Sequence, residues 1–468
     1  MSVKKFTAAA CAALLLLSAS ALSACGGVQN RIKITVGLWR GTSAAEKEFY
    51  EECKIAFEDK FPQYEVVSSP YLYSDDTVVA KFASGQLPAV FEVDASSVGR
   101  AYSNGFVRDV TAYMKQYGWY EKADGYFLSE ISSGEVTCGV PAEQYSAGMV
   151  LNLPLLHEAG VIGKGADGKY ILYENGSAVY PDTFEKVARA ARAVRAKSRA
   201  YGLFLPSGDG ENGKIYADII YNFGCDRLEY GDGDGKWKLS LPDGGVGDAM
   251  RWVKQMAQEG CVDSSFAYGV DDWAAKMAGG EVAMAFCYSS SLTAALTAEP
   301  SLNGNIAFVP LPTVRESAVA VWNGKVYAVS TSASDEQAKG VFEFLKFFGY
   351  GPDTDGQSTY YTEKRIRENY AKGVSVFPPL SGWKDGEYNA AMRVLYGRYA
   401  NTEDEYFSVF FDGFDARKRS GEPYARDELH ILLDELFGIM LFEPTTSNLV
   451  TLLAESEQRF TERYLKDI

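Results

Sequence analysis

Histidine is almost absent from this chain of 468 residues, which contains only His157 and His430. A zinc centre built on imidazole ligands therefore has little support. The chain has seven cysteines and no CxxC pair, and those beyond residue 25 are odd in number and widely spaced. Such spacing predicts buried thiols rather than a disulfide framework. These later cysteines are Cys53, Cys138, Cys225, Cys261 and Cys287.

Clustered acidic ligands for a metal ion are also scarce. The segment 231–235 reads Gly-Asp-Gly-Asp-Gly, and closely spaced aspartates can supply oxygen ligands to calcium. An EF-hand-type loop needs further acidic positions and a closing glutamate, whereas Lys236, Trp237 and Lys238 come next. A glycine-rich hairpin turn is favoured over a calcium loop. We therefore expect no bound metal and no cofactor.

Positive charge is in deficit, with 46 lysines and arginines against 62 aspartates and glutamates. The formal net charge is −16, and it becomes −18 if Lys4 and Lys5 are lost with an N-terminal leader. A nucleic-acid partner would require a basic face, so this class of function is disfavoured. A dedicated anionic ligand is also less expected, although one local arginine could still serve it.

No apolar run has the length of a comfortable membrane span. The nearest, residues 6–17, is short and follows two lysines, as in a secretory signal peptide. The sequence Leu-Ser-Ala-Cys that ends at Cys25 resembles a bacterial lipobox, which implies cleavage before that cysteine and its lipidation. The alternative is a signal peptide whose cysteine is incidental. We expect a signal peptide at 1–24, a lipidated linker at 25–30, and a protein tethered by lipid alone to the extracellular face of the cytoplasmic membrane.

Strands and helices alternate in the mature chain, which predicts an α/β fold of two or three domains. An alternating segment at 32–38, a helical pattern ending before Pro62 and a β-prone segment at 64–67 form the first βαβ unit. Open α/β sheets bind ligands at strand ends. Polar and aromatic residues adjoin several predicted strands there: Trp39, Arg40, Asp94, Tyr288, Ser289, Trp322 and Asn323.

The stretch 138–152 places three functional side chain types side by side. A β-prone piece at 136–140 ends at Pro141, and a second strand is predicted at 147–151. Between them lies a polar elbow whose carboxylate, amide and phenol can hydrogen-bond hydroxyl groups and offer a flat ring. An ordinary surface turn is the alternative. The elbow residues are Glu143, Gln144, Tyr145 and Ser146.

Four blocks in a fixed order carry a family resemblance. They read SGQLPAVFEVD at 84–94, GVPAEQYSAGMVLN at 139–152, MAGGEVAMAF at 277–286, and NGKVYAVS at 323–330 with the helix that follows. Together they resemble the extracellular sugar-binding lipoproteins of bacterial ABC importers, the maltodextrin-binding-protein-like family 1 of solute-binding proteins. The similarity runs from about residue 32 to residue 348, and the helical tail beyond matches less clearly.

The resemblance implies a type II periplasmic-binding-protein-like α/β fold, with two lobes joined by a multi-crossing hinge around a ligand cleft. The first lobe is expected at 31–130 plus 311–350, and the second at 131–310 plus 351–468. The implied function is capture of a carbohydrate, expected to be an oligosaccharide, by a monomer that delivers it to ABC transporter permease subunits. No enzymatic activity is implied.

Family contacts transfer only where the loops match, and they are the residues already placed near strand ends. Sugar rings stack on aromatic faces, and their hydroxyls need paired donors and acceptors. The predicted stacking platforms are Trp39, Tyr145, Tyr288 and Trp322. The predicted hydroxyl partners are Arg40, Asp94 and Glu143, with Gln144, Ser289 and Asn323 in the same loops.

Two other functions remain open on the residues alone. One is uptake of a non-sugar solute such as a polyamine, a peptide or a cofactor, which the acidic composition permits. The other is an enzyme on the same fold, like bacterial thiaminase I, but Cys138 lies within a strand and has no neighbouring histidine in sequence. A glycosidase would need two carboxylates flanking a bond, for which Glu143 and Asp94 are the candidates.

Overall fold

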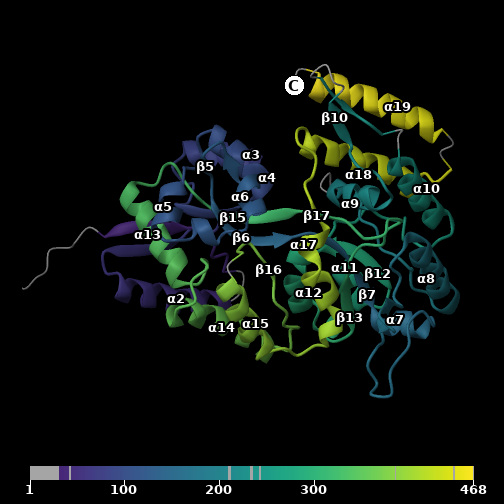
Figure 1. Cartoon of the computed structure of the whole chain (residues 1–468), viewed down its shortest axis with the longest axis horizontal. Helices are drawn as coiled ribbons and strands as arrows, with labels where there is room; N and C mark the ends of the chain where they lie inside the picture. Colours follow the sequence, from purple (N-terminus) through teal and green to yellow (C-terminus); the bar gives the residue numbers. More distant parts are fainter. Residues whose placement is uncertain are drawn as a thin grey trace, which may run out of the picture.

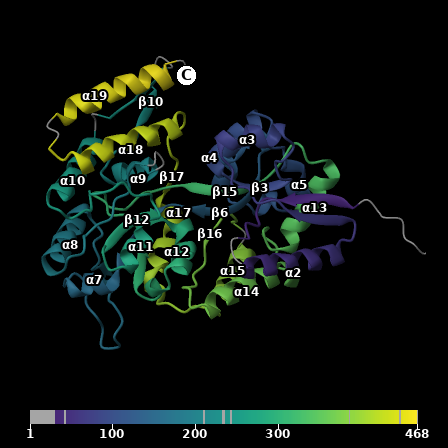
Figure 2. The same cartoon turned by 180° about the vertical axis from the view of Figure 1, so that it is seen from behind.

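The computed structural model describes residues 31–466 except 42–43, 209–211, 232–235, 242–243, 385 and 446–447. The predicted signal peptide, the linker with Cys25 and the aspartates of the glycine-rich turn lie outside the described residues. Two α/β lobes lie side by side, as Figure 1 shows, and Figure 2 shows the same arrangement from behind. Within the described part, no helix is both long and apolar enough to cross a membrane.

The first lobe is built on a six-stranded mixed sheet in the order β16-β6-β15-β3-β1-β2. β1 runs parallel to β2 and β3, whereas β15 is antiparallel to both β3 and β6. The alternation of apolar residues turns Ile34 and Val36 into the core. The strands are β1 (Ile32–Val36), β2 (Tyr64–Ser68), β3 (Val90–Asp94), β6 (Val140–Tyr145), β15 (Asn323–Val329) and β16 (Leu380–Ser381).

An aromatic core joins this sheet to its helices. Phe57 of α2 and Phe344 of α13 meet with ring centroids 5.7 Å apart. α13 approaches the sheet closely at Gly340, where an added Cβ would lie 2.5 Å from the side chain of Ile34. The helices of this lobe are α2 (Ala44–Lys60), α3 (Asp75–Ala83), α4 (Ala95–Ser103), α5 (Thr111–Gln116), α6 (Gly125–Glu130) and α13 (Asp335–Phe347), with the hairpin of β4 (Ser132–Ser133) and β5 (Val136–Thr137).

The second lobe has an antiparallel sheet in the order β12-β7-β13 that is buried except at Tyr288. Its strands are β7 (Ala147–Asn152), β12 (Met284–Tyr288) and β13 (Ile306–Val309). Around it lie α7 (Leu153–Glu158), α8 (Phe184–Lys197), α9 (Gly213–Asn222), α10 (Gly245–Gln258), α11 (Trp273–Ala278) and α12 (Leu292–Ala298), with the hairpins β8 (Tyr173–Glu174)/β9 (Ser177–Ala178) and β10 (Glu229–Gly231)/β11 (Trp237–Leu239). The last hairpin brackets the glycine-rich segment, where we expected a hairpin turn.

The polar elbow expected at 143–146 is instead the end of strand β6. Because β6 lies between β15 and β16, its backbone is paired through Tyr145. Pro141 does not end the strand, since the pairing with β15 shifts register between Lys325 and Val326, next to the proline. Only Ser146 separates β6 from β7, so a single residue passes the chain from the first sheet to the second.

The chain passes between the lobes at other places as well. β14 (Ala320–Val321) pairs in parallel with β17 (Lys418–Arg419), and β14 leads through Trp322 directly into β15 of the first sheet. β16 of the tail adds a further strand to the first sheet beside β6. The described chain therefore has a hinge made of several segments that lie side by side.

The tail after residue 350 divides between the lobes, whereas we expected all of it in the second. α14 (Gly356–Ala371) packs on the first lobe, where Lys364 pairs with Glu52 and the ring of Tyr361 joins the aromatic core. α18 (Arg426–Phe442) packs on α9 and α10 of the second lobe. The apolar faces of the two helices match different cores. The other tail helices are α15 (Gly386–Gly397), α16 (Ser408–Asp412), α17 (Phe414–Arg417) and α19 (Leu449–Phe460).

Candidate functional site

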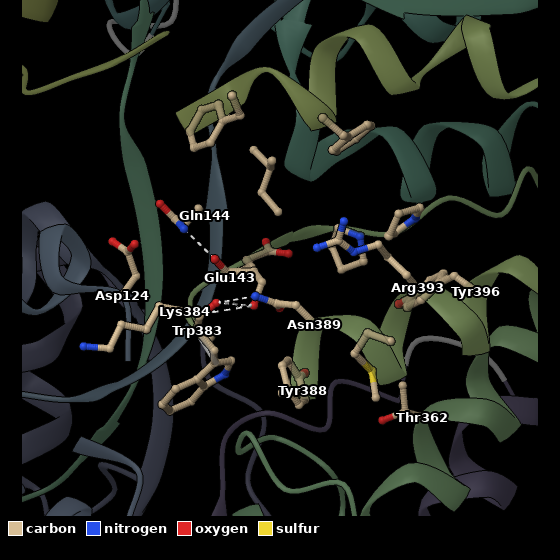
Figure 3. A pocket seen from close by; sticks show the side chains of 18 of the residues that line it. Asp124, Glu143, Gln144, Thr362, Trp383, Lys384, Tyr388, Asn389, Arg393 and Tyr396 are labelled. Carbon is tan, nitrogen blue, oxygen red and sulfur yellow. Dashed lines mark hydrogen bonds between the residues drawn. The ribbon is translucent and has the colours of Figure 1, made fainter. Parts of the chain in front are cut away.

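A cavity of about 660 Å³ lies between the lobes, beside the end of β6. Figure 3 shows Glu143 and Gln144 of this strand facing a wall formed by Tyr388, Asn389 and Tyr396 of α15. Residues of α16 and α17 close the side toward the second lobe. The volume falls in the range of ligand pockets, about 300–1,000 Å³.

The cavity continues into a second hollow of about 270 Å³. This hollow reaches Ser289 at the end of β12 and Asn369 at the end of α14. Because eight residues border both hollows, the two adjoin and form one elongated groove. The shared residues are Glu143, Gln144, Thr362, Arg365, Pro379, Leu380, Tyr396 and Phe411.

Both aromatic side chains and polar groups line the groove. Asn389 is oriented by donating from Nδ2 to the carbonyl oxygen of Trp383 at 2.8 Å. Lys325 pairs with Glu92 at 2.9 Å at the first-lobe end, and Arg40 approaches the same carboxylate at 3.6 Å. The aromatic residues of the cavity wall are Tyr327, Tyr350, Trp383, Tyr388 and Tyr396, with Phe411 and Phe414 from the second lobe.

Glu143, which was predicted as a hydroxyl partner, borders both hollows of the groove. Burial raises the pKa of its carboxyl to about 7, and the positive charge of Lys325 opposes part of that shift. The carboxylates of Glu92 and Asp94 add to the rise. Near neutral pH this group exchanges between a hydrogen-bond donor and an acceptor, both of which suit a hydroxyl ligand.

We predict that Glu143→Gln removes a pH dependence of stability. An unfolded glutamate ionises near 4.5 and the folded one near 7, so the folded state binds the proton more tightly between these values. The free energy of unfolding of the wild type therefore falls as the pH rises through that window. The free energy of unfolding of the variant, relative to that of the wild type, should therefore rise by up to about 3 kcal/mol as the pH increases from 4 to 8. Denaturant unfolding across pH measures this, and a difference that stays constant with pH would contradict it.

Gln144 borders the cavity, but the hydrogen bonds of its side chain connect the strands of the hinge. Its Oε1 accepts from Trp322 Nε1 at 2.6 Å and from Lys418 Nζ at 3.3 Å, and its Nε2 donates to the carbonyl oxygen of Ser381. One amide thus joins β6 to segments beside β15, β17 and β16. The group was predicted as a ligand contact, and these bonds give it a role in fixing the hinge strands.

Tyr145, Tyr288 and Asp94, each predicted as a ligand contact, lie together away from the cavity wall. Tyr145 Oη donates to Asp94 Oδ1 at 3.2 Å, and the rings of Tyr145 and Tyr288 meet edge to face at 5.8 Å. Asp94 stands at the N-cap of α4 without making a side-chain cap. Tyr145 and its partners therefore connect the lobes where β6 passes into β7, and none of the three lines the main groove in the described structure.

Two predicted stacking platforms are core residues. Trp39 is 3% exposed, with its ring stacked on Tyr50 of α2 at 5.1 Å and against Phe344 at 5.2 Å. Trp322 is 2% exposed and packs edge-on against Phe127 at 5.0 Å. A tryptophan at a strand end can be covered by a neighbouring helix, and in both places this happens.

The remaining predicted ligand contacts, Arg40, Ser289 and Asn323, lie at three different places. Arg40 borders a shallower hollow of about 420 Å³ that reaches Ala294 of the second lobe. Ser289 Oγ accepts from the backbone N–H of Ser146 at 3.4 Å while lining the smaller end of the groove. Asn323 donates from Nδ2 to the carbonyl oxygen of Val321 and belongs to β15.

Sequence reasoning missed the tail, which supplies most of the cavity wall. α14 contributes Thr362 and Arg365, one turn apart. α15 contributes Tyr388, Met392 and Tyr396, which recur every four residues and therefore share one helix face. That aromatic stripe is visible in the sequence, but a core-facing stripe has the same spacing.

The two lobes, the hinge of several strands and the ligand-sized groove between them define the fold of a two-lobe solute-binding protein. The chain belongs to the bacterial extracellular solute-binding proteins, since the profile of that family matches residues 54–363. A search of curated protein sequences gives no match.

Solved structures share the fold over almost their whole length. An ABC transporter solute-binding protein from Thermotoga lettingae TMO, bound with α-D-tagatose, has a TM-score of 0.66 at 16% identity and covers 92% of this chain and 99% of its own. The GacH receptor of Streptomyces glaucescens, solved unliganded and with acarbose, has a TM-score of 0.65 at 17% identity, with 92% and 98% covered. Maltose-bound MalE3 of T. maritima has a TM-score of 0.63 at 16% identity, with 92% and 98% covered.

Proposed function

We propose that this protein captures an oligosaccharide in the interlobe groove and delivers it to the permease of an ABC importer while lipidated Cys25 tethers it to the membrane. The observation that carries the proposal is the groove wall, which combines aromatic side chains with hydrogen-bonding side chains. A sugar ring has apolar C–H faces and hydroxyl edges, so it needs both kinds of group. The carbohydrate ligands of the structural neighbours agree with this chemistry.

The elongated shape of the groove favours a chain of sugars over one ring. The main cavity and its extension share a border from Glu143 to Tyr396, and together they span from the first-lobe sheet to the end of β12. Tyr388 and Tyr396 stand two helical turns apart on α15. Successive rings of an oligosaccharide could therefore meet successive aromatic side chains.

The groove carries charges of both signs. The carboxylates of Glu92, Asp124, Glu143, Asp412 and Asp415 line the main cavity beside the cations Arg365, Lys384 and Arg393. A polycationic ligand would therefore meet three positive groups as well as the carboxylates. A solute with many hydroxyls, in contrast, uses acceptors and donors of both kinds.

The geometry also argues against the two enzymatic alternatives, a cysteine nucleophile and a glycosidase carboxylate pair. The thiol of Cys138 is buried and its pKa is raised to about 11, whereas a nucleophilic cysteine needs a lowered pKa. Asp94 is occupied by the hydroxyl of Tyr145 and does not line the groove opposite Glu143. A pair of carboxylates flanking a glycosidic bond is therefore not formed by these two residues.

A thermal-shift screen of residues 28–468 tests the proposal. The panel contains oligosaccharides, monosaccharides, polyamines, peptides and thiamine. A ligand that binds only the folded state at a hundredfold excess over its Kd stabilises the protein by about 2.7 kcal/mol. We expect one family of oligosaccharides to raise the melting temperature and polyamines to leave it unchanged.

Tyr396→Ala should then weaken the glycan identified in that screen by about tenfold or more, because the variant removes a ring that borders both hollows. Tyr396→Phe should keep most of the affinity. Tyr370→Ala is the matched control, since Tyr370 is exposed on α14 outside the groove. Equal affinities for the Tyr396→Ala variant and the wild type, measured by calorimetry, would place the sugar elsewhere.

A further inference from the structure

Among the described cations that line the groove, Arg365 is the one that borders both of its hollows. It lies on α14 and is half-buried. Its guanidinium donates to Thr362 Oγ1 at 3.2 Å and lies 5.3 Å from the ring centre of Tyr350. Within the described residues no carboxylate comes within ion-pair distance of it, whereas its neighbour Lys364 pairs with Glu52 outside the groove.

The surroundings of Arg365 are phenol rings rather than acids. Its positive charge acts on the hydroxyls of Tyr350, Tyr388 and Tyr396, where it opposes the rise in pKa that burial causes. The charges that act on Glu143 come from Lys325, Glu92 and Asp94. In the smaller hollow, Arg365 and Glu143 are the charged lining residues, whereas the other carboxylates, Glu92, Asp124, Asp412 and Asp415, line the main cavity alone.

A guanidinium in this position is costly unless something compensates it. Partial removal from water penalises a charge, and a closing lobe would remove more water. Contact with a tyrosine ring and a neutral hydroxyl compensates only in part. The planar fork of arginine matches the paired oxygens of a carboxylate or a sulfate, which it binds through two parallel hydrogen bonds.

We propose that Arg365 selects a carbohydrate that carries an oxyanion, either the carboxylate of a uronic acid or a sulfate ester. The inference rests on the proposed function, since it assigns the class of sugar taken by the same groove. It also explains how a protein of strongly negative net charge accommodates an acidic ligand. One local cation, rather than the overall field, provides the recognition.

Calorimetric titration of the full mature chain with matched glycans tests this assignment. Each neutral oligosaccharide is compared with its uronate counterpart of the same stereochemistry and with its sulfated form. We expect one anionic form to bind at least tenfold more tightly than the neutral one. Arg365→Gln should weaken that anionic ligand by about 10- to 100-fold, the loss of a hydrogen bond to a charged group, and change the neutral form by less than threefold.

Two further variants separate direct contact between Arg365 and the ligand from the general effect of removing a positive charge. Arg367→Gln removes the same charge from the same helix at an exposed position outside the groove, so it should leave all affinities unchanged. Arg365→Lys keeps the charge without the planar fork and should give an intermediate loss. The melting temperature of each unliganded variant shows that the fold is retained, and the comparison of uronate with sulfate arms identifies the oxyanion.

The possible results distinguish a failure of this inference from a failure of the proposed carbohydrate-binding function. Tight binding of neutral glycans with unchanged affinity in Arg365→Gln overturns the inference and leaves the carbohydrate function standing. An equal loss of affinity for the anionic ligand in Arg367→Gln also overturns the inference, because long-range electrostatics rather than direct contact would then explain the effect. Absence of binding to every neutral and anionic glycan overturns both proposals.

Discussion

Trp322→Ala is expected to lower the free energy of unfolding by about 3–5 kcal/mol, the usual cost of truncating a buried tryptophan. Trp322 is 2% exposed, packs edge-on against Phe127 and donates from Nε1 to Gln144 at 2.6 Å. The substitution leaves a void exactly where β14 passes into β15, and removes one of the bonds that hold the hinge strands. Chemical denaturation of the unliganded protein measures the loss.

Trp322→Phe is the control, since it retains a ring in the void and loses mainly the hydrogen bond, for about 1–2 kcal/mol. If Trp322 were instead an exposed platform for a sugar, Trp322→Ala would leave stability within about 0.5 kcal/mol and abolish ligand affinity. That result would show the ring to be at the ligand rather than in the core.

Gly213→Ala is expected to destabilise the protein by about 3 kcal/mol, at the upper end of the range for overpacking. Gly213 opens α9, and a Cβ built there would lie 1.7 Å from the carbonyl oxygen of His430 in α18. The obstructing atom belongs to the backbone, so a change of rotamer cannot make room. The two helices would have to separate along the contact by which the tail covers the second lobe.

Gly438→Ala provides the opposite expectation within α18 itself. An added Cβ at Gly438 meets nothing within 4 Å, and the residue lies inside a helix. Alanine should therefore stabilise the protein by about 0.5–1 kcal/mol. Thermal unfolding of the two variants side by side measures both effects, and similar midpoints would contradict the close approach at Gly213.

The strands were predictable because their signals are local. The alternation at 64–67 and the apolar runs at 147–151 and 282–286 correspond to β2, β7 and β12 with shifts of one or two residues. Glu143 was predicted on an elbow between two strands, and the structure has it within β6 at the edge of the cavity. Its raised pKa could not be predicted, because it depends on burial and on charges from β3 and β15.

The errors in the site have a common physical origin. Trp39 follows a strand end, as predicted, but exposure depends on whether α2 brings Tyr50 over its ring. The stripe of Tyr388 and Tyr396 on α15 has the same periodicity as a buried face, and only the position of α15 opposite β6 turns it toward the groove. Both outcomes are decided by the packing of elements distant in sequence.

The passage of the tail to both lobes has a consequence for how the molecule is made. α9 and α10 of the second lobe are covered by α18, which lies far later in the chain, as the teal and yellow helices of Figure 1 show. Tyr216 of α9 stacks on Phe437 of α18 with ring centroids 4.1 Å apart. A chain that emerges with its N-terminus first keeps this apolar face uncovered until α18 arrives. Because contacts between distant segments form slowly, the second lobe matures only after the C-terminal helices have emerged.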